Sequence, residues 1–501
     1  MRRPAGDGSP TVGGVLRAAA SRHPDRPALV ARGGTLSYAD LDRRADAAAG
    51  ALHALGVRPG DRVAACLPND LDVVVAFHGS QRIGAVWAGI GEALTAAEQQ
   101  ALVDVCTPRV FLAGPACEVD GPAVVGLRRW RQHVAAAPAP PAVGVDPLAP
   151  AGIAFSSGTT GAPKAVVHSQ ANLLLPAEVL AATRGWDAGL RKGDGLPFTI
   201  LNMLVLSTLA ATYAGGCSIV LDTRDPGAIA AAIAAERITV WNGAPAQLFD
   251  LARRPDADLG SLTEAWTGGG TCPEHVRAAF ADTHGVPVTA TYGLSEAPTV
   301  VAIDPVSGDH RSAASGRVLP HLDVAAYDDG GVRLEPGATG ELGLLPAPGG
   351  PWAGRWRPPL GHWADGVLRP LPAGPLMTGD VGSVDADGWL TMVDRKKLTI
   401  VRGGANVYPA EVEAVLLAHP GVAAVAVLGV PDERLGERVA ALVVPAAEGV
   451  TGAALAAYCA ERLARYKIPQ VWARTPALPL NGMGKTVRTG LPELLDRAPR
   501  L

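Results

Sequence analysis

Segments with helical spacing of apolar residues alternate with short apolar segments along most of the chain, and this alternation restricts the fold most. Residues 36–55 have one apolar face at helical spacing, with Ser37 as a candidate cap, and residues 63–67 follow as a predicted strand. The same pattern returns at residues 229–240, 276–291 and 411–427. Strands that alternate with helices favour largely parallel sheets covered by helices. The sequence therefore predicts an α/β protein.

Length and composition fit a large globular protein. The chain has 501 residues, of which 48% are hydrophobic and 18% are charged. This length suggests about three structural lobes and allows a sizeable core. The composition excludes collagen-like, coiled-coil and disulfide-rich folds. The formal net charge of −4 argues against a nucleic-acid-binding surface, which would carry a basic excess.

Cysteine usage and the N-terminal sequence favour the cytoplasm. The six cysteines are scattered without a CxxC pair, so we interpret them as buried, reduced thiols rather than zinc ligands or disulfides. No apolar stretch follows the first arginines, so we predict no signal peptide. Residues 199–221 are uncharged and long enough to span a membrane, but polar residues and Gly215-Gly216 interrupt them. We expect a buried helix, a turn and a strand at residues 217–221 instead, without membrane association.

A change in composition near residues 378–404 marks a predicted domain boundary. Short β-like pieces lead there into a basic cluster at residues 395–397 and a glycine pair at residues 403–404, after which the alternation restarts. We therefore predict an N-terminal domain over residues 1–394 and a C-terminal domain over residues 395–501. The latter has an ordinary domain size.

The strongest local signal for chemistry is the segment Phe155-Ser-Ser-Gly-Thr-Thr-Gly-Ala-Pro-Lys164, which follows an apolar strand. Glycines allow the backbone to approach an anion closely, and amide, hydroxyl and lysine groups can then bind phosphate oxygens. The spacing is not that of a Walker A loop, which requires GxxxxGK followed by Ser or Thr. An ordinary surface loop rich in Ser, Gly and Pro is the alternative interpretation.

The loop and several further motifs resemble the acyl-adenylate-forming superfamily: acyl-CoA synthetases, adenylation domains of nonribosomal peptide synthetases, and firefly luciferase. Residues 157–164 are similar to the phosphate loop of this superfamily. Other similar motifs follow in the same order as in the superfamily, at residues 36–41, 56–63, 268–273, 291–296, 340–342, 378–380, 394–395 and 481–485. The resemblance covers residues 15–491, and so many ordered motifs exclude chance.

The resemblance implies a fold and a movement. The N-terminal domain would contain layered α/β subdomains, with two parallel-type sheets and a small β-barrel, and the C-terminal domain would be small, mobile and α+β. The C-terminal domain would rotate between two half-reactions about a hinge at Lys397. One face would present Lys485 for adenylation, and the other would present Gly403 and Gly404 to the thiol. Residues 403–413 resemble the CoA-ligase branch more than the peptide-synthetase branch.

The resemblance also implies a role for each matching residue. Lys485 would bridge the substrate carboxylate and the α-phosphate of ATP, while Glu296 and Thr159 would hold Mg²⁺. The phosphates would be bound by Ser156, Ser157, Gly158, Thr159, Thr160, Gly161 and Lys164. Adenine and ribose would contact Gly268, Gly269, Gly270, Thr291, Tyr292, Gly293, Ser295, Asp380 and Arg395. His168 and His310 match no motif, and we interpret both as structural.

Two departures from the superfamily pattern bear on the substrate and the hinge. Thr199 stands where relatives have the His of a P-L-F-H block, and Leu398 replaces a common acidic residue after the hinge. Amino-acid-activating relatives carry an Asp just after the corresponding Phe, whereas here no carboxylate occurs until Asp222. A buried ammonium without a partner is strongly unfavourable. The sequence therefore predicts an acid without an α-amino group, in a pocket formed by Phe198, Thr199, Met203, Trp241 and Trp266.

The leading hypothesis is an ATP-dependent acid–CoA ligase that uses ATP, Mg²⁺ and CoA. The first alternative is a stand-alone adenylating enzyme that loads a separate phosphopantetheinyl carrier protein in natural-product biosynthesis. The second is an inactive AMP-binding module, which the joint presence of Lys164, Glu296, Asp380 and Lys485 disfavours. We favour a place in the core over the site for Trp241, Trp266 and Trp389, although Trp241 and Trp266 lie near the expected acyl pocket. We expect a monomer or a homodimer.

Overall fold

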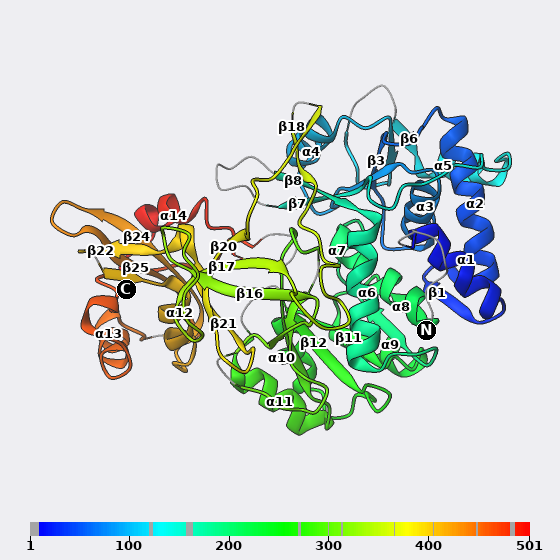
Figure 1. Cartoon of the computed structure of the whole chain (residues 1–501). Coiled ribbons are helices and arrows are strands. Elements are labelled where there is room, and N and C mark those ends of the chain that lie inside the picture. Colours follow the sequence, from blue (N-terminus) through cyan, green and yellow to red (C-terminus); the bar gives the residue numbers. More distant parts are fainter. Residues whose placement is uncertain are drawn as a thin grey trace. The chain divides into compact units, whose positions relative to one another are not determined.

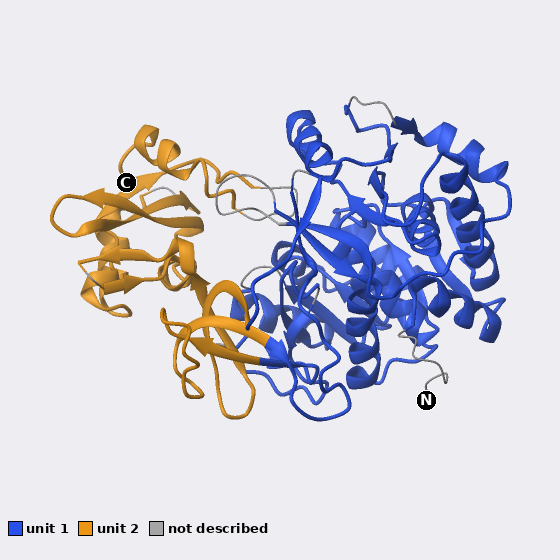
Figure 2. Ribbon diagram, turned by 45° about the horizontal axis from the view of Figure 1, so that its top comes forward, with its two compact units in different colours: residues 1–323, 345–374 blue, residues 324–344, 375–501 orange. Residues whose placement is uncertain are grey.

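The computed structural model describes residues 10–119, 124–156, 164–268, 272–298, 300–311, 314–364, 366–403, 405–446, 449–480 and 486–501. The chain forms two compact units (Figure 2): unit 1 comprises residues 1–323 and 345–374, and unit 2 comprises residues 324–344 and 375–501. Unit 2 thus contains a small sheet that precedes residue 395 in the sequence. The domain boundary after residue 394 stays a prediction.

The first sheet of unit 1 is a nine-stranded sheet in the described part of the chain (Figure 1). Its strands, in spatial order, are β15 (Arg317–Val318), β14 (Val300–Ile303), β13 (Val288–Gly293), β12 (Glu264–Gly268), β11 (Val240–Asn242), β9 (Arg191–Asp194), β10 (Cys217–Val220), β1 (Pro27–Ala31) and β2 (Gly34–Ser37). Six neighbouring strands, from β13 to β1, run parallel. Their carboxyl ends therefore lie along one edge.

The second sheet of unit 1 has eight described strands. In spatial order they are β19 (Val367–Arg369), β18 (Gly361–Ala364), β8 (Lys164–Ser169), β7 (Pro150–Ser156), β4 (Val86–Gly89), β3 (Arg62–Cys66), β5 (Val110–Ala113) and β6 (Val124–Gly126). The strands from β7 to β6 run parallel, and β8 returns antiparallel to β7.

Helices of unit 1 pack against both sheets. They are α1 (Val12–Arg22), α2 (Tyr38–Ala54), α3 (Leu71–Arg82), α4 (Ala96–Cys106), α5 (Leu127–Ala135), α6 (Gln170–Arg184), α7 (Leu201–Met203), the π-helix η1 (Leu204–Leu209), α8 (Ala210–Ala214), α9 (Pro226–Ala235), α10 (Pro245–Ala252) and α11 (Glu274–His284). One apolar cluster contains Leu29 and Val220 of the first sheet together with Val63 and Trp87 of the second. Helix packing between the sheets thus forms a shared core.

The described residues of unit 2 form two further sheets. The four-stranded sheet has the order β16 (Leu322–Tyr327), β17 (Gly340–Pro346), β20 (Leu376–Val384) and β21 (Leu390–Arg395). The five-stranded sheet consists of β22 (Ile400–Arg402), β23 (Ala405–Val407), β24 (Val422–Asp432), β25 (Gly436–Pro445) and β26 (Val471–Arg474). The described helices of unit 2 are η2 (Lys396–Leu398), α12 (Pro409–Leu417), α13 (Gly452–Ala460), η3 (Arg465–Lys467) and α14 (Leu491–Arg497).

The structure confirms the predicted α/β class and several local patterns. Ser37 caps α2 as predicted, in a reciprocal capping box with Asp40. The uncharged segment after residue 198 forms α7, η1 and α8, turns at Gly215 in a left-handed conformation, and continues as β10. No described helix is both long and apolar enough to cross a bilayer. All six cysteines are free thiols, and four of them are buried as predicted, but Cys117 and Cys272 are only half-buried.

Candidate active site

Two neighbouring strands of the nine-stranded sheet end at residues predicted to flank the adenine. Gly268 is the last residue of β12, and Thr291, Tyr292 and Gly293 close β13. The strands run parallel with Gly268 opposite Thr291, so these residues meet at the carboxyl edge of the sheet. A Cβ atom at position 268 would lie 2.1 Å from Thr291 Oγ1, which explains the glycine there. This edge is where ligands bind in open α/β sheets.

Several predicted site residues lie outside the described residues, and their roles stay predictions. They are Ser157, Gly158, Thr159, Thr160, Gly161, Gly269, Gly270, Gly404 and Lys485. The ends of the phosphate loop are described: Ser156 closes β7 and stands opposite Lys164, the first residue of β8. The loop therefore connects two antiparallel strands.

The structure brings the predicted phosphate lysine and the predicted metal carboxylate into one region. Lys164 is exposed at the start of β8, and Glu296 is half-buried after β13. His362 on β18 interacts electrostatically with both residues. Burial and the positive charge of Lys164 lower the pKa of its imidazole, whereas the negative charge of Glu296 raises it. The sequence does not predict His362, because β18 pairs with β8 from a distant part of the chain.

The surroundings of Glu296 fit the role of a Mg²⁺ ligand. Its carboxylate makes no hydrogen bond or ion pair with another described residue. Mg²⁺ usually takes one or two protein carboxylates and completes its shell with phosphate oxygens and water. Among the described residues, no group of three or more His, Cys, Asp or Glu side chains could hold a metal ion. The chain would therefore offer Mg²⁺ this carboxylate alongside the phosphates of the nucleotide.

His168 connects β8 to the segment that carries Glu296. Its Nε2 donates to the carbonyl oxygen of Ser295 at 2.8 Å, and Asn172 Nδ2 donates to its Nδ1 at 3.1 Å. The side chain is fully buried, and burial lowers its pKa to about 4. The neutral imidazole thus holds the backbone next to Glu296, in line with the structural interpretation of His168.

The buried imidazole of His168 should make stability fall as the pH falls. Its pKa is about 4 in the folded state and about 6.5 in the unfolded state, so only the unfolded chain takes up a proton between these values. We expect the free energy of unfolding to lose up to about 1.4 kcal/mol per pH unit over this window. His168→Gln should make the free energy of unfolding less dependent on pH by that amount, as measured by urea unfolding between pH 7 and pH 5. His275→Gln, which replaces an exposed histidine, should leave the pH dependence unchanged. The same pH dependence in wild type and His168→Gln would contradict the assignment.

The segment predicted to line the acyl pocket packs closely against the eight-stranded sheet. Phe198 and Thr199 are almost fully buried. A Cβ atom at Gly89, the last residue of β4, would lie 1.5 Å from the carbonyl oxygen of Thr199, so only glycine permits this approach. Asn69 holds the segment from the other side: its Oδ1 accepts from Phe198 N at 2.8 Å and its Nδ2 donates to Leu196 O at 3.0 Å. No motif in the sequence marks Asn69 for this role.

Met203, Trp241 and Trp266, the other residues predicted at the acyl pocket, are also buried. Met203 ends α7 just before the π-helix η1, a helix type that is frequent at functional sites. Trp241 belongs to an apolar cluster with residues of α9, α10 and α11. Trp266 stacks on Trp186 with ring centroids 5.4 Å apart, and its Nε1 donates to Glu264 at 2.6 Å. Acyl contact by these residues stays a prediction.

Unit 2 carries the predicted ribose residues on neighbouring strands. Asp380 on β20 stands opposite Arg395 on β21, and Arg395 Nε lies 2.7 Å from Asp380 Oδ1. Asp380 is only 1% exposed. The predicted hinge residue Lys397 is the middle residue of η2. Gly403 follows β22 with φ +60°, a left-handed conformation that favours glycine.

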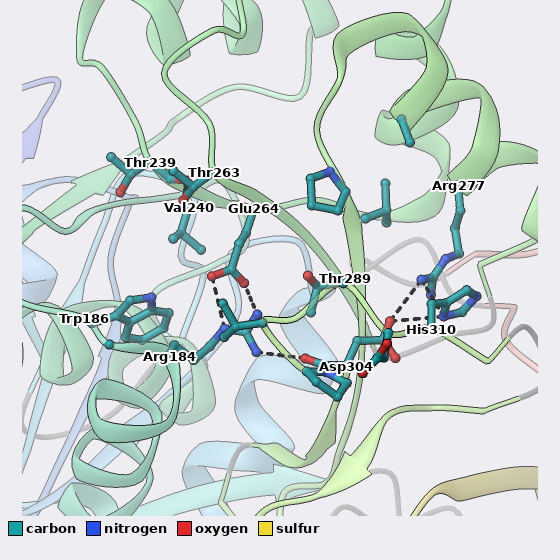
Figure 3. A pocket seen from close by; sticks show the side chains of 18 of the residues that line it. Arg184, Trp186, Thr239, Val240, Thr263, Glu264, Arg277, Thr289, Asp304 and His310 are labelled. Carbon is teal, nitrogen blue, oxygen red and sulfur yellow. Dashed lines mark hydrogen bonds and ion pairs between the residues drawn. The ribbon is translucent and has the colours of Figure 1, made fainter.

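A cavity of about 580 Å³ lies elsewhere in unit 1, where β11, β12 and β13 begin (Figure 3). Arg184 forms an ion pair with Glu264 and donates to the carbonyl oxygen of Asp304 at 2.9 Å. Arg277 donates to Asp304 Oδ2 at 3.0 Å and to His310 Nδ1 at 2.8 Å. The described residues that line this cavity include none of the predicted site residues. Its charged groups pair with one another across the strand ends.

Comparison with known proteins matches both parts of the chain to one family. Residues 16–344 match the AMP-binding enzyme family and residues 411–485 match the AMP-binding enzyme C-terminal domain. Feruloyl-CoA synthase from Amycolatopsis sp is 33% identical over 488 residues, 95% of this chain and 96% of the relative. Long-chain-fatty-acid–CoA ligase FadD13 from Mycobacterium tuberculosis is 31% identical over 514 residues, covering 96% and 98%. ATP-bound MatB from Rhodopseudomonas palustris superposes with a TM-score of 0.84 at 26% identity, covering 97% and 99%. The chain therefore belongs to the AMP-binding enzyme family.

Proposed function

We propose that the chain is an AMP-forming acid–CoA ligase that activates a carboxylic acid without an α-amino group. ATP and the acid first give an acyl-adenylate and pyrophosphate, and the CoA thiol then displaces AMP to give the acyl-CoA. The observation that supports the proposal most directly is a pair of contacts between segments that carry family motifs. Gly268 lies opposite Thr291 where two parallel strands end, and His168 of β8, the strand that Lys164 begins, donates to Ser295 O next to Glu296.

The first half-reaction requires two anions to meet, because a carboxylate oxygen attacks the α-phosphate of ATP. Preorganised positive charge lowers the barrier to such a step. In our proposal Lys485 bridges the carboxylate and the α-phosphate, while the phosphate loop and Lys164 bind the β- and γ-phosphates. Mg²⁺ held by Glu296 would neutralise charge on the departing pyrophosphate. His168 keeps Ser295 in place next to Glu296 through its 2.8 Å hydrogen bond.

The second half-reaction uses an activated acyl group, because AMP is a far better leaving group than the oxygen of a free carboxylate. We propose that the C-terminal domain, residues 395–501, changes its orientation about Lys397 between the two steps. Lys485 would serve the first orientation, and the segment with Gly403 and Gly404 would face the thiol in the second. Asp380 and Arg395 would hold the ribose.

The charge pattern around the acyl segment supports an acid without an amino group. Residues 199–221 contain no carboxylate. The nearby Asp194 is fully buried and already binds Lys192 Nζ at 3.0 Å and 3.1 Å. A substrate ammonium would therefore find no free acidic partner on this segment, and burying it unpaired is costly. Two relatives, feruloyl-CoA synthase and long-chain-fatty-acid–CoA ligase FadD13, are named for acids without an α-amino group, which agrees with this inference.

A carrier protein remains the second candidate for the thiol acceptor, since its phosphopantetheine arm ends in the same thiol as CoA. The Gly-Gly-Ala-Asn-Val-Tyr-Pro sequence at residues 403–409 favours CoA. Pyrophosphate release measured across a panel of carboxylic acids, with and without CoA, tests both candidates. We expect turnover only with CoA, together with an acyl-CoA of the matching mass. A single burst of acyl-adenylate that CoA cannot discharge would favour the carrier protein, and no release with any acid would contradict the proposal.

A further inference from the structure

Glu341 belongs to a sequence motif, Gly340-Glu-Leu342, that matches the family but has no part in the function proposed so far. It lies on β17 of unit 2, opposite Val381 of β20. The next pair on the same two strands joins Gly343 to Met377. One residue of β17 therefore faces three residues of β20, Thr378 to Asp380. The segment 378–380 is a β-bulge, a feature that often redirects a side chain at a site.

The bulge carries Asp380, and each of its residues has a defined partner. Thr378 Oγ1 donates to Leu342 O at 2.9 Å and accepts from Asp380 N at 3.1 Å. Gly379 adopts φ +72°, and its N–H donates to Glu341 Oε1 at 3.1 Å. The carboxylate of Glu341 thus satisfies the backbone amide next to Asp380, at a place where the regular ladder cannot.

The second oxygen of the same carboxylate binds the start of the hinge segment. Lys396 Nζ donates to Glu341 Oε2 at 2.9 Å and to Asp329 Oδ1 at 2.8 Å. The Glu341 side chain is 16% exposed, whereas that of Asp329 is 93% exposed. Of these two partners of Lys396, Glu341 is the one that is largely buried and also accepts a hydrogen bond from the bulge.

We infer that Glu341 is a positioning residue for the nucleotide: one oxygen fixes the bulge that presents Asp380, and the other ties this bulge to the hinge segment at Lys396. The inference rests on the proposed contact between Asp380 and the ribose hydroxyls. The position of the Glu341 oxygen matters more than its charge, because the Gly379 amide needs an acceptor oxygen at a fixed distance. An amide oxygen can supply that acceptor, but a carboxylate one methylene shorter cannot reach it.

The test compares ATP with 2′-deoxyATP and 3′-deoxyATP in acid-dependent pyrophosphate release by the full-length enzyme. A charge-assisted hydrogen bond to one hydroxyl corresponds to a preference for ATP of roughly 10- to 100-fold in kcat/KM. We expect Glu341→Gln to keep the wild-type preference within about twofold. Glu341→Asp should reduce the preference for ATP over the deoxynucleotides by about fivefold or more relative to wild type, mainly through a higher KM for ATP. Asp329→Asn, which releases Lys396 on its exposed side only, should keep the wild-type preference.

Asp380→Ala, which removes the acceptor oxygens, separates failure of this inference from failure of the proposed function. It should abolish the preference; if it does not, the ribose is bound elsewhere and the proposed role of Asp380 is wrong. If Asp380→Ala abolishes the preference but Glu341→Asp retains it, Asp380 is the ribose ligand and Glu341 does not position it. If Glu341→Gln loses the preference and Glu341→Asp keeps it, the ion pair between Glu341 and Lys396 determines the preference, and the hydrogen bond from Glu341 to the bulge does not. A loss of activity that is equal for all three nucleotides would also overturn the inference, because it would indicate a structural role only.

Discussion

The Lys485→Ala variant should lose acid-dependent ATP–pyrophosphate exchange by on the order of 10³-fold while it still converts supplied acyl-adenylate and CoA to thioester. The expected loss rests on the proposed role of Lys485, whose charge would act where a carboxylate and a phosphate must meet. Removing one preorganised group that stabilises transition-state charge typically costs 10²- to 10³-fold. The second half-reaction would use another face of the C-terminal domain and should stay within a few-fold of wild type.

Two rates measured on the same protein preparation check this prediction. Exchange of labelled pyrophosphate into ATP reports the first half-reaction, and thioester formation from synthetic acyl-adenylate reports the second. Arg497→Ala, which removes an exposed positive charge from α14 of the same unit, is the matched control and should leave both rates unchanged. Equal losses in both half-reactions of Lys485→Ala would show that the lysine does not act in adenylation alone.

Local patterns in the sequence predicted individual elements well. The cap of α2 depends on Ser37 and Asp40, three residues apart, so the sequence contains the whole signal. The interruption of the uncharged segment by Gly215-Gly216 likewise predicted the turn before β10, because glycine favours the left-handed conformation found at Gly215. Such signals need no knowledge of the remaining chain.

Strand order and the supporting contacts of the site could not be predicted in the same way. β9 lies between β11 and β10, and β18 joins β8, since these pairings depend on packing between distant segments. His168, Asn69 and His362 are single polar residues without a motif, and only the folded chain brings them beside Ser295, Phe198 and Lys164. The family resemblance supplied the remaining residue roles, which need the experiments above.

The largest effect on stability should come from Lys192, a fully buried lysine on β9. Its Nζ lies 3.0 Å and 3.1 Å from the two carboxylate oxygens of Asp194, and both side chains are 0% exposed. Burial raises the pKa of Asp194, and Lys192 opposes this increase. Lys192→Met would leave the carboxylate without its partner, and we expect a loss of about 3–5 kcal/mol in the free energy of unfolding. Urea unfolding at pH 7 measures this loss.

A second substitution distinguishes the unpaired charge from the loss of lysine itself. Desolvation of an isolated buried charge is the main cost of breaking such a pair, so Lys192→Met combined with Asp194→Asn should recover most of the stability. Arg17→Met is the exposed counterpart: Arg17 binds Asp46 at 3.2 Å and is 60% exposed, so its loss should cost less than about 1 kcal/mol. If Lys192→Met cost no more than Arg17→Met, the pair would carry no charge in the native protein, with the carboxyl of Asp194 protonated and the amine of Lys192 neutral.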